Sequence, residues 1–196
     1  MTAPGAAGSI PPSLPNTNNV ILIGYRGCGK SAVGQFVADR LGWPLVDTDR
    51  LIEAAAGHSI RTIFADSGEA AFRALETEQV ARVAQATHQV ISVGGGAVLD
   101  LRNRDALAAA GVCFWLTAPA EVLYERMQAD ARNADTRPAL TDRTALDEVR
   151  HLLQERQPLY AALAQHVVQT AGRSVSQVAA DILGLLAQHD ASAETR

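Results

Sequence analysis

The chain has 196 residues, of which 47% are hydrophobic and 19% are charged. This composition supplies a sizeable core, fits one domain with or without tails, and excludes wholesale disorder. The formal net charge of −4 argues against a globally basic nucleic-acid binder. No apolar run approaches the roughly 20 residues that span a bilayer, and the N-terminus is unlike a secretion signal. Two cysteines make no disulfide framework. We therefore expect a cytoplasmic protein that binds neither membrane nor nucleic acid.

Short apolar runs alternate along the chain with stretches of helical periodicity. The predicted strands cover residues 20–23, 45–47, 90–93, 112–116 and 167–169. The predicted helices cover 31–41, 49–56, 60–86 (one short and one long helix), 101–110, 120–127, 145–164 and 175–186. Polar segments predict flexible tails at 1–18 and 188–196, around a domain at 19–187, and a mobile loop at 128–144.

Strand and helix alternate, and the strands are almost continuously apolar. This pattern predicts an α/β fold in which helices cover both faces of a parallel sheet. Ligands in such folds bind at the carboxyl ends of the strands. Gly24, Asp47, Gly94 and Thr117 each fall at or just after the end of a predicted strand, so we expect them along one rim.

The strongest motif lies between the first strand and the first helix. Residues 24–31 read Gly-Tyr-Arg-Gly-Cys-Gly-Lys-Ser, a complete G-x-x-x-x-G-K-[ST] phosphate-binding loop. Its backbone N–H groups and the helix N-terminus attract phosphate. Lys30, the one lysine of the chain, is expected to reach the β- and γ-phosphates, and the Ser31 hydroxyl to bind Mg²⁺. The predicted nucleotide contacts in this segment are Gly27, Cys28, Gly29, Lys30, Ser31 and Ala32.

Two carboxylates follow the second strand, in Asp47-Thr48-Asp49. Residues two apart in an extended segment point to the same side, so both can face the phosphate site. One carboxylate suits Mg²⁺, and the other can hold the hydroxyl of a phosphoryl acceptor. Asp49 alone could instead be a helix N-cap, and the two roles can coexist.

The remaining candidates are weaker when taken singly. Gly94-Gly95-Gly96 follows the third strand, where it is either a tight turn or a close approach of backbone to a small ligand. Arg73 and Glu76 lie three apart on a predicted helix and can pair. Arg73, Arg137 and Arg156, each considered alone, are typical of surface arginines.

Taken together, these residues resemble the shikimate kinase family. The motifs that carry the resemblance occur in order over residues 19–187: 24–31, Asp47-Thr-Asp49, Gly68-Glu-Ala-Ala-Phe-Arg73 with Glu76, Gly94-Gly-Gly96-Ala97, Arg137-Pro, and Arg156 with Pro158 and Tyr160. The resemblance implies a P-loop NTPase fold with a five-stranded parallel sheet and a mobile lid. It implies Mg²⁺- and ATP-dependent phosphorylation of the 3-hydroxyl of shikimate, on the route to chorismate. We expect a monomer whose partners are ATP and shikimate.

The resemblance also implies a role for individual residues. Lys30, Asp49 and Arg137 would be catalytic, with Arg137 on the lid that closes over the phosphates. Ser31 and Asp47 would lie at the metal. Shikimate would be bound by Asp49, Arg73, Arg156 and the backbone of Gly94, Gly95 and Gly96, the two arginines holding its carboxylate. Arg126 and Arg173 would lie beside the adenine.

Three other functions are compatible with a phosphate-binding loop. A gluconate or nucleotide kinase shares the loop but differs in its acceptor site, and Asp47-Thr-Asp49 with the triple glycine and Arg156-x-x-x-Tyr160 favours shikimate. A GTP-binding switch needs a guanine-reading Asn-Lys-x-Asp, which a chain with one lysine lacks. A non-catalytic kinase homologue would be expected to lack a phosphate, metal or acceptor residue, and none is missing.

Overall fold

A computed structural model describes residues 18–129 and 145–194. Its five strands form one parallel sheet in the order β2-β3-β1-β4-β5, as the alternation of strands and helices predicts. The strands are β1 (Asn19–Ile23), β2 (Leu45–Asp47), β3 (Gln89–Ser92), β4 (Val112–Thr117) and β5 (His166–Gln169). The helices are α1 (Lys30–Leu41), α2 (Thr48–Ala56), α3 (Ile60–Val83), the 3₁₀ turn η1 (Ala97–Leu99), α4 (Leu101–Ala110), α5 (Ala120–Ala129), α7 (Ala145–Leu163) and α8 (Val175–Glu194).

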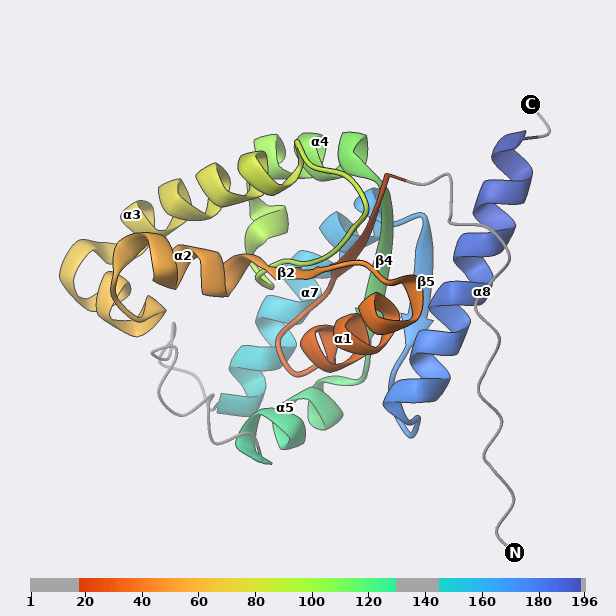
Figure 1. The fold of residues 1–196 in the computed structure, drawn as a ribbon. Coiled ribbons are helices and arrows are strands. Elements are labelled where there is room, and N and C mark those ends of the chain that lie inside the picture. Colours follow the sequence, from red (N-terminus) through yellow and green to blue (C-terminus); the bar gives the residue numbers. More distant parts are fainter. Residues whose placement is uncertain (1–17, 130–144, 195–196) are drawn as a thin grey trace, which may run out of the picture.

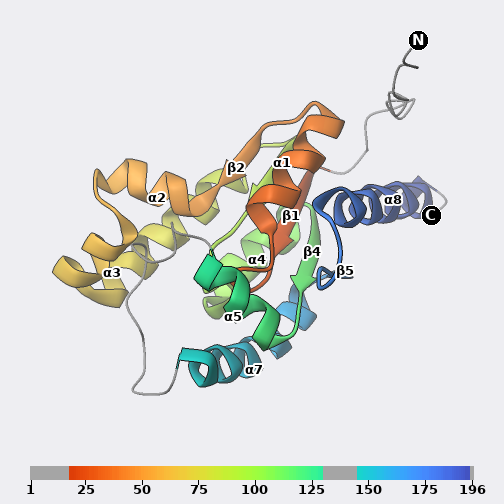
Figure 2. The ribbon, with the colours of Figure 1, turned by 90° about the horizontal axis from the view of Figure 1, so that it is seen from below.

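Helices cover both faces of the sheet, and the alternation of side chains along β1 explains why (Figures 1 and 2). Val20 and Leu22 pack in the cluster that contains buried residues of α1 and α8. Ile21 and Ile23 point the other way, into the cluster formed with α3, α4 and the C-terminal half of α7. Because successive side chains leave a strand on opposite faces, a central strand with two buried faces must be apolar throughout.

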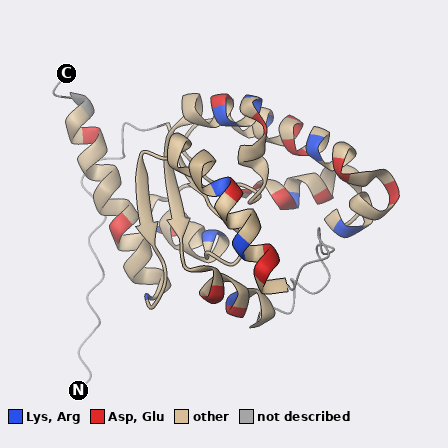
Figure 3. Cartoon of the chain, turned by 180° about the vertical axis from the view of Figure 1, so that it is seen from behind, with Lys and Arg blue, Asp and Glu red and all other residues tan. Residues whose placement is uncertain are grey.

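Charged side chains are confined almost entirely to the helices and loops, as Figure 3 shows. Among the five strands, Asp47 at the end of β2 is the one Asp, Glu, Lys or Arg residue. A charge inside such a sheet would be desolvated on both faces, which costs several kcal/mol unless it is paired. Asp47 avoids this cost because it lies at the rim, where the site is built.

The predicted pair of helices over residues 60–86 is present as α3 with a break at Gly68. Gly68 has φ of 77° and ψ of 175°, outside the helical region. The break divides α3 into a short first part, which packs with α2 through Ile52, Ile60 and Ile63, and a longer second part. The second part carries Arg73 toward the sheet rim.

The predicted start of the C-terminal tail, at residue 188, is wrong. The sequence placed the end of the ordered domain near residue 188, whereas α8 continues to Glu194. Polar residues do not end a helix; glycine and proline do, and residues 188–194 contain neither. The ring of His189 also lies 5.9 Å from that of His166 on β5, which anchors this part of the helix.

Two other predicted segments, the N-terminal tail and the loop at 128–144, lie mainly outside the residues that the structure describes. The N-terminal tail, apart from Asn18, lies outside the described residues, as does 130–144, which contains Arg137. Gln128 and Ala129, assigned by the sequence to the loop, belong to α5. None of the helices described here is both long and apolar enough to cross a membrane.

A buried asparagine closes the end of the sheet opposite the site. Asn19 is fully buried, and its Nδ2 donates to the carbonyl oxygens of Ala86 (2.8 Å) and Ala110 (2.9 Å). Its Oδ1 accepts from the backbone N–H of Gln89 at 3.0 Å. One side chain therefore joins the turn after α3 and the end of α4 to the start of β3.

Replacing this amide by an apolar group of similar size should destabilise the whole domain. Asn19→Leu removes the side-chain partner of three backbone groups, two of them in buried hydrogen bonds, and we expect a loss of roughly 3 kcal/mol in the free energy of unfolding. That corresponds to a fall in Tm of about 6–12 °C for a domain of this size. Gln35→Leu is the control, because Gln35 is exposed and its amide bonds only Asp39. Equal losses for the two variants in urea and thermal unfolding would refute this role of Asn19.

Candidate active site

The loop between β1 and α1 is wrapped tightly against the sheet. Gly24, Gly27 and Gly29 all have positive φ, at 137°, 79° and 95°. A Cβ on Gly24 would lie 2.3 Å from the carbonyl oxygen of Leu116 at the end of β4, closer than any real contact. Glycine is therefore required both for the backbone conformation and for the close approach. The resulting curve directs backbone N–H groups inward at the N-terminus of α1.

Lys30 is held by the loop that contains it. Its Nζ donates to the carbonyl oxygens of Gly24 (2.7 Å) and Tyr25 (3.1 Å) and lies 3.7 Å from Sγ of Cys28. These contacts hold the ammonium at the loop, on the side that faces a cavity. Cys28 itself is buried beneath the loop, with 1% of its surface exposed, so its side chain packs inside the fold.

A cavity of about 380 Å³ lies at the carboxyl ends of β1, β2 and β3. The loop and the start of α1 form one wall, the start of α2 a second, and the turn after β3 a third. Its lining residues are Arg26, Gly27, Gly29, Lys30, Ser31, Ala32, Asp47, Asp49, Arg50, Glu53, Ile60, Ser92, Val93, Gly94, Gly95 and Arg126. Most of the residues that the sequence singled out thus come together at the rim predicted from the strand ends.

Ser31 and Asp47 form an oxygen-rich pair in this cavity. Ser31 Oγ donates to Asp47 Oδ2 at 3.2 Å. The other carboxylate oxygen of Asp47 accepts from the backbone N–H groups of Asp49 (3.0 Å) and Arg50 (3.5 Å). Asp47, not Asp49, is therefore the N-cap of α2. The alternative interpretation of Asp49 as a cap is wrong, and its carboxylate belongs to the cavity wall.

Hard oxygens of this kind suit Mg²⁺, which binds proteins through one or two side chains and takes its other ligands from phosphate and water. The described part of the chain contains no cluster of three or more His, Cys, Asp or Glu residues that could hold a metal on its own. The pair formed by Ser31 and Asp47 fits a cation that arrives with a nucleotide.

The triple glycine after β3 is where the acceptor side of the cavity is assembled. A Cβ on Gly94 would lie 2.7 Å from Oδ1 of Asp49 and 2.9 Å from Oε1 of Glu76. A Cβ on Gly96 would lie 2.5 Å from Nη1 of Arg73. Gly94 and Gly96 thus leave room for functional groups that a side chain would displace, and Gly95 packs against the backbone of the loop between β1 and α1. A simple tight turn would not need all three.

Arg73 is fixed by two carboxylates on its own helix. It pairs with Glu76 at 2.5 Å and with Glu69 at 3.1 Å. Burial by itself lowers the pKa of Arg73, but attraction and hydrogen bonding to Glu76 raise that pKa above its ordinary value. The side chain of Glu76 is 1% exposed and that of Arg73 is 21% exposed, so the pair predicted from their spacing is largely shielded from solvent.

Arg156 is buried, which excludes its interpretation as a surface residue. Only 7% of its surface is exposed, and its Nη1 donates to the carbonyl oxygen of Gly95 at 3.3 Å. The Tyr160 hydroxyl donates to the same oxygen at 2.5 Å, and burial raises the pKa of that tyrosine. The guanidinium of Arg156 also lies 5.5 Å from the centroid of the Tyr25 ring. Within the described residues it has no carboxylate partner, so it remains available to an anion.

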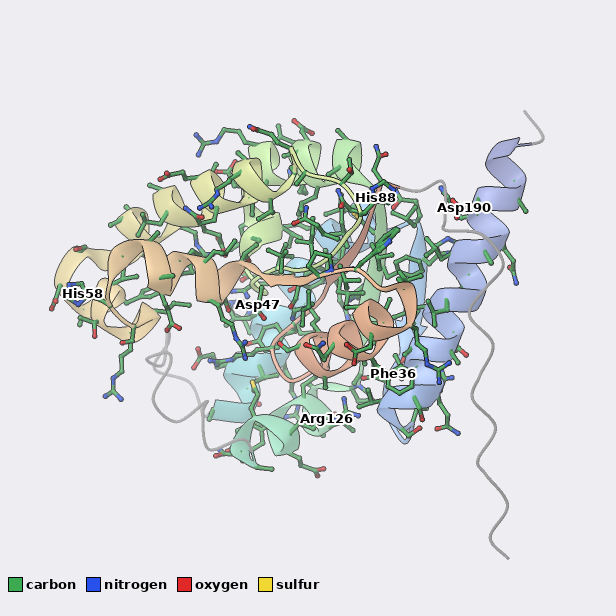
Figure 4. The ribbon with its side chains drawn as sticks, in the orientation of Figure 1. Phe36, Asp47, His58, His88, Arg126 and Asp190 are labelled. Carbon is green, nitrogen blue, oxygen red and sulfur yellow. The ribbon has the colours of Figure 1, made fainter. Side chains whose placement is uncertain are left out.

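The two arginines assigned to the adenine differ in placement. Arg126 lines the cavity, and Figure 4 shows it on α5. Its guanidinium donates to Thr170 Oγ1 (2.9 Å) and to the Thr170 carbonyl oxygen (2.7 Å), joining α5 to the segment after β5. Arg173 lies outside the cavity lining and pairs with Asp181 at 2.7 Å. Arg137 lies outside the described residues.

Sequence reasoning missed three charged residues of the cavity wall. Arg26 stands at a variable position of the phosphate-binding motif, and its place inside the motif was a usable signal. Arg50 and Glu53 lie on α2, and Glu53 comes one helical turn after Asp49. Nothing in the local sequence separated these two from ordinary solvent-facing helix residues.

Comparison with known proteins gives one consistent family. Residues 26–187 match the family model described as shikimate kinase. A shikimate kinase of Symbiobacterium thermophilum is 46% identical over 165 residues, covering 84% of this chain and 94% of that protein. A shikimate kinase of Rhodopirellula baltica is 41% identical over 165 residues, covering 84% and 88%.

Solved structures agree with this result. Shikimate kinase from Acinetobacter baumannii, in complex with shikimate, superposes with a TM-score of 0.83 at 32% identity, over 90% of this chain and 96% of that one. A gluconokinase from Sinorhizobium meliloti superposes with a TM-score of 0.58 at 19% identity, over 91% and 96%. At that identity the second match shows a shared fold and nothing about the acceptor.

The crowding around Gly94 generates a prediction. Gly94→Ala places a methyl group against Asp49 and Glu76, so the Asp49 carboxylate must move. We expect kcat for phosphoryl transfer to fall on the order of 10²-fold, because small displacements of catalytic groups cost this much. Nucleotide affinity, measured by calorimetry, should stay near wild type because the loop is unaltered.

Gly184→Ala is the matched control for this substitution. A Cβ on Gly184 in α8 meets nothing within 4 Å and its φ is not positive, so this variant should keep full activity. Wild-type turnover in Gly94→Ala would contradict the proposed crowding.

Proposed function

The chain belongs to the shikimate kinase family, and we propose that it transfers the γ-phosphoryl group of ATP to the 3-hydroxyl of shikimate. The products are shikimate 3-phosphate and ADP. The observation that carries the proposal is a buried guanidinium, that of Arg156, held at the carbonyl oxygen of Gly95 beside a phosphate-binding loop. A phosphate site next to an unpaired buried cation suits a small carboxylate-bearing acceptor.

ATP binds along the loop in this proposal. Backbone N–H groups of Gly27, Cys28 and Gly29, and those of Ser31 and Ala32 at the start of α1, surround the phosphates. Lys30 exchanges its contacts with the Gly24 and Tyr25 carbonyl oxygens for the β- and γ-phosphates, whose charge attracts it more strongly. The adenine lies toward Arg126, with Arg173 at its outer edge and Arg137 closing over the phosphates.

Mg²⁺ is held in this proposal by Ser31 Oγ and, directly or through water, by Asp47. The ion supplies charge neutralisation at the phosphate oxygens. Asp47 is positioned for this because one of its oxygens is committed to capping α2, which fixes the direction of the other.

Asp49 holds the acceptor hydroxyl and accepts its proton. Its carboxylate lies in the cavity wall against Gly94, within the same cavity as Lys30. A carboxylate at hydrogen-bond distance from the hydroxyl orients the attacking oxygen in line with the γ-phosphorus and removes positive charge as the new bond forms.

Arg73 and Arg156 bind the shikimate carboxylate from two different helices. Arg73 is preorganised by Glu69 and Glu76, and Arg156 by Gly95 and the Tyr25 ring. Two fixed guanidiniums favour an anionic group over a neutral one, because without the anion the buried guanidinium of Arg156 has no carboxylate partner among the described residues.

The experiment that tests the proposal is an ATP-consumption assay with shikimate, gluconate and nucleoside monophosphates in parallel. Of these acceptors, only shikimate should be phosphorylated by ATP. Mass spectrometry and NMR should identify the product as shikimate 3-phosphate. Removal of Mg²⁺ with a chelator should abolish activity. Turnover with gluconate or a nucleoside monophosphate, and none with shikimate, would refute the proposal.

A double cycle of two substrates and two proteins tests what Arg156 recognises. Arg156→Ala should lower kcat/KM for shikimate about 30- to 1,000-fold, which corresponds to 2–4 kcal/mol. A shikimate amide without the carboxylate should be poor with the wild-type enzyme. The amide should lose little further activity in Arg156→Ala, because the interaction between carboxylate and guanidinium is already absent once either partner is removed. Additive losses would show that Arg156 does not bind the carboxylate.

A further inference from the structure

Among the residues that the structure describes, four cationic side chains line the cavity: those of Arg26, Lys30, Arg50 and Arg126. The ammonium of Lys30 is held by loop carbonyls and the guanidinium of Arg126 by Thr170. The guanidiniums of Arg26 and Arg50 make no hydrogen bond or ion pair with any residue in the described part of the chain. A guanidinium carries five donors, so an unpaired one at a cavity wall is suited to an anionic ligand.

Arg26 lies where the two halves of the site meet. Its backbone nitrogen is 3.3 Å from the position that a Cβ on Gly95 would take, so its part of the loop touches the triple glycine directly. The phosphate-binding residues Gly27–Ser31 follow on one side, and the acceptor turn Gly94–Gly96 is on the other. Arg50, by contrast, starts from α2 and is exposed.

The neighbour of Arg26 along the chain links it to the acceptor site. The Tyr25 ring is buried, and its centroid lies 5.9 Å from the guanidinium carbon of Arg26 and 5.5 Å from that of Arg156. Two guanidiniums thus lie near one aromatic ring, and neither is paired with a carboxylate of the described residues. Their positive charge favours anionic ligands in this part of the site.

We propose that Arg26 is a further catalytic residue, which binds the phosphoryl group as it passes from ATP to the acceptor hydroxyl. This inference rests on the proposed function. The shikimate carboxylate is already assigned to Arg73 and Arg156, whereas the phosphoryl group between donor and acceptor has Lys30 on its donor side. The cation at the junction of loop and acceptor turn therefore suits the phosphoryl group better than the carboxylate.

A cation at this position can stabilise the charge that develops on the phosphoryl group during transfer. The bond from the γ-phosphorus to the β–γ bridging oxygen breaks, and that oxygen leaves with ADP and the electron pair. The bond from the γ-phosphorus to the acceptor oxygen forms, and the hydroxyl proton passes to Asp49. Negative charge is spread over three equatorial oxygens during this step, and the fork of Arg26 can bind two of them.

Three variants separate this role from a general effect of charge. Arg26→Met keeps the length of the apolar stem and should lower kcat on the order of 10²-fold, with KM for ATP and shikimate near wild type. Arg26→Lys keeps the charge but not the fork and should fall between Arg26→Met and wild type. Arg50→Met removes the same charge from the same cavity at a different position and should lower kcat much less than Arg26→Met does.

Calorimetry with the product gives a readout independent of turnover. Shikimate 3-phosphate should bind Arg26→Met roughly tenfold more weakly than it binds the wild type, which is the loss of one charge-assisted contact. Shikimate should bind both proteins equally, since it lacks the phosphate. Weakened binding of both ligands would assign Arg26 to the carboxylate and overturn the inference.

The remaining outcomes are also decisive. Unchanged kcat and product affinity in Arg26→Met, or an equal loss of kcat in Arg50→Met, overturns the inference and leaves the proposed function intact. A wild-type protein inactive on shikimate overturns both.

Thermal unfolding verifies that each variant is folded. If Arg26→Met does not fold, Arg26→Lys decides the matter: lower kcat with weaker product binding supports the role, and wild-type values refute it.

Discussion

The carbonyl oxygen of Gly95 is the point on which the site depends. It accepts hydrogen bonds from Arg156 and Tyr160, both on α7, while its own residue packs against the loop between β1 and α1. Three elements far apart in the sequence thus meet at one peptide. Because that peptide is buried, its carbonyl oxygen needs a hydrogen-bond donor. The donor is a guanidinium, so the same hydrogen bond also places a cation at the acceptor site.

The absence of side chains on the neighbouring residues makes this junction possible. Gly94 leaves room for Asp49 and Glu76, and Gly96 leaves room for Arg73. The turn therefore brings two carboxylates and two guanidiniums close to one short segment of backbone. In a site of low dielectric constant, groups fixed in this way act without further reorganisation, which is the most effective way to stabilise developing charge.

Charge in and beside the cavity is divided between groups that are satisfied by the protein and groups that are not. Arg73 is paired with Glu76, and Asp47 is committed to the N-terminus of α2 and to Ser31. Arg156 and Arg26 have no such carboxylate partner among the described residues. The paired groups fix the geometry of the site, and the unpaired cations give it affinity for anions. A kinase for a carboxylate-bearing acceptor needs both kinds, since its substrates bring at least two separate negative groups.

The sequence by itself determined the elements that depend on near neighbours in the chain. The apolar strands, the loop of residues 24–31 and the pairing of Arg73 with Glu76 follow from spacings of a few residues, and the structure contains all three. The parallel sheet followed from the alternation of strands and helices. The extension of α8 to Glu194 was missed, because its anchoring contact with β5 comes from a residue distant in sequence.

Only the tertiary structure decided which charges are buried and what they face. An isolated arginine has the same appearance in a sequence whether it is exposed or buried, so the burial of Arg156 could not be predicted from its neighbours in the chain. The choice of Asp47 over Asp49 as the cap of α2 was equally hidden, because either could accept from the first turn. The burial of Arg156 depends on its contact with Gly95, 61 residues away in the chain, which only folding brings about.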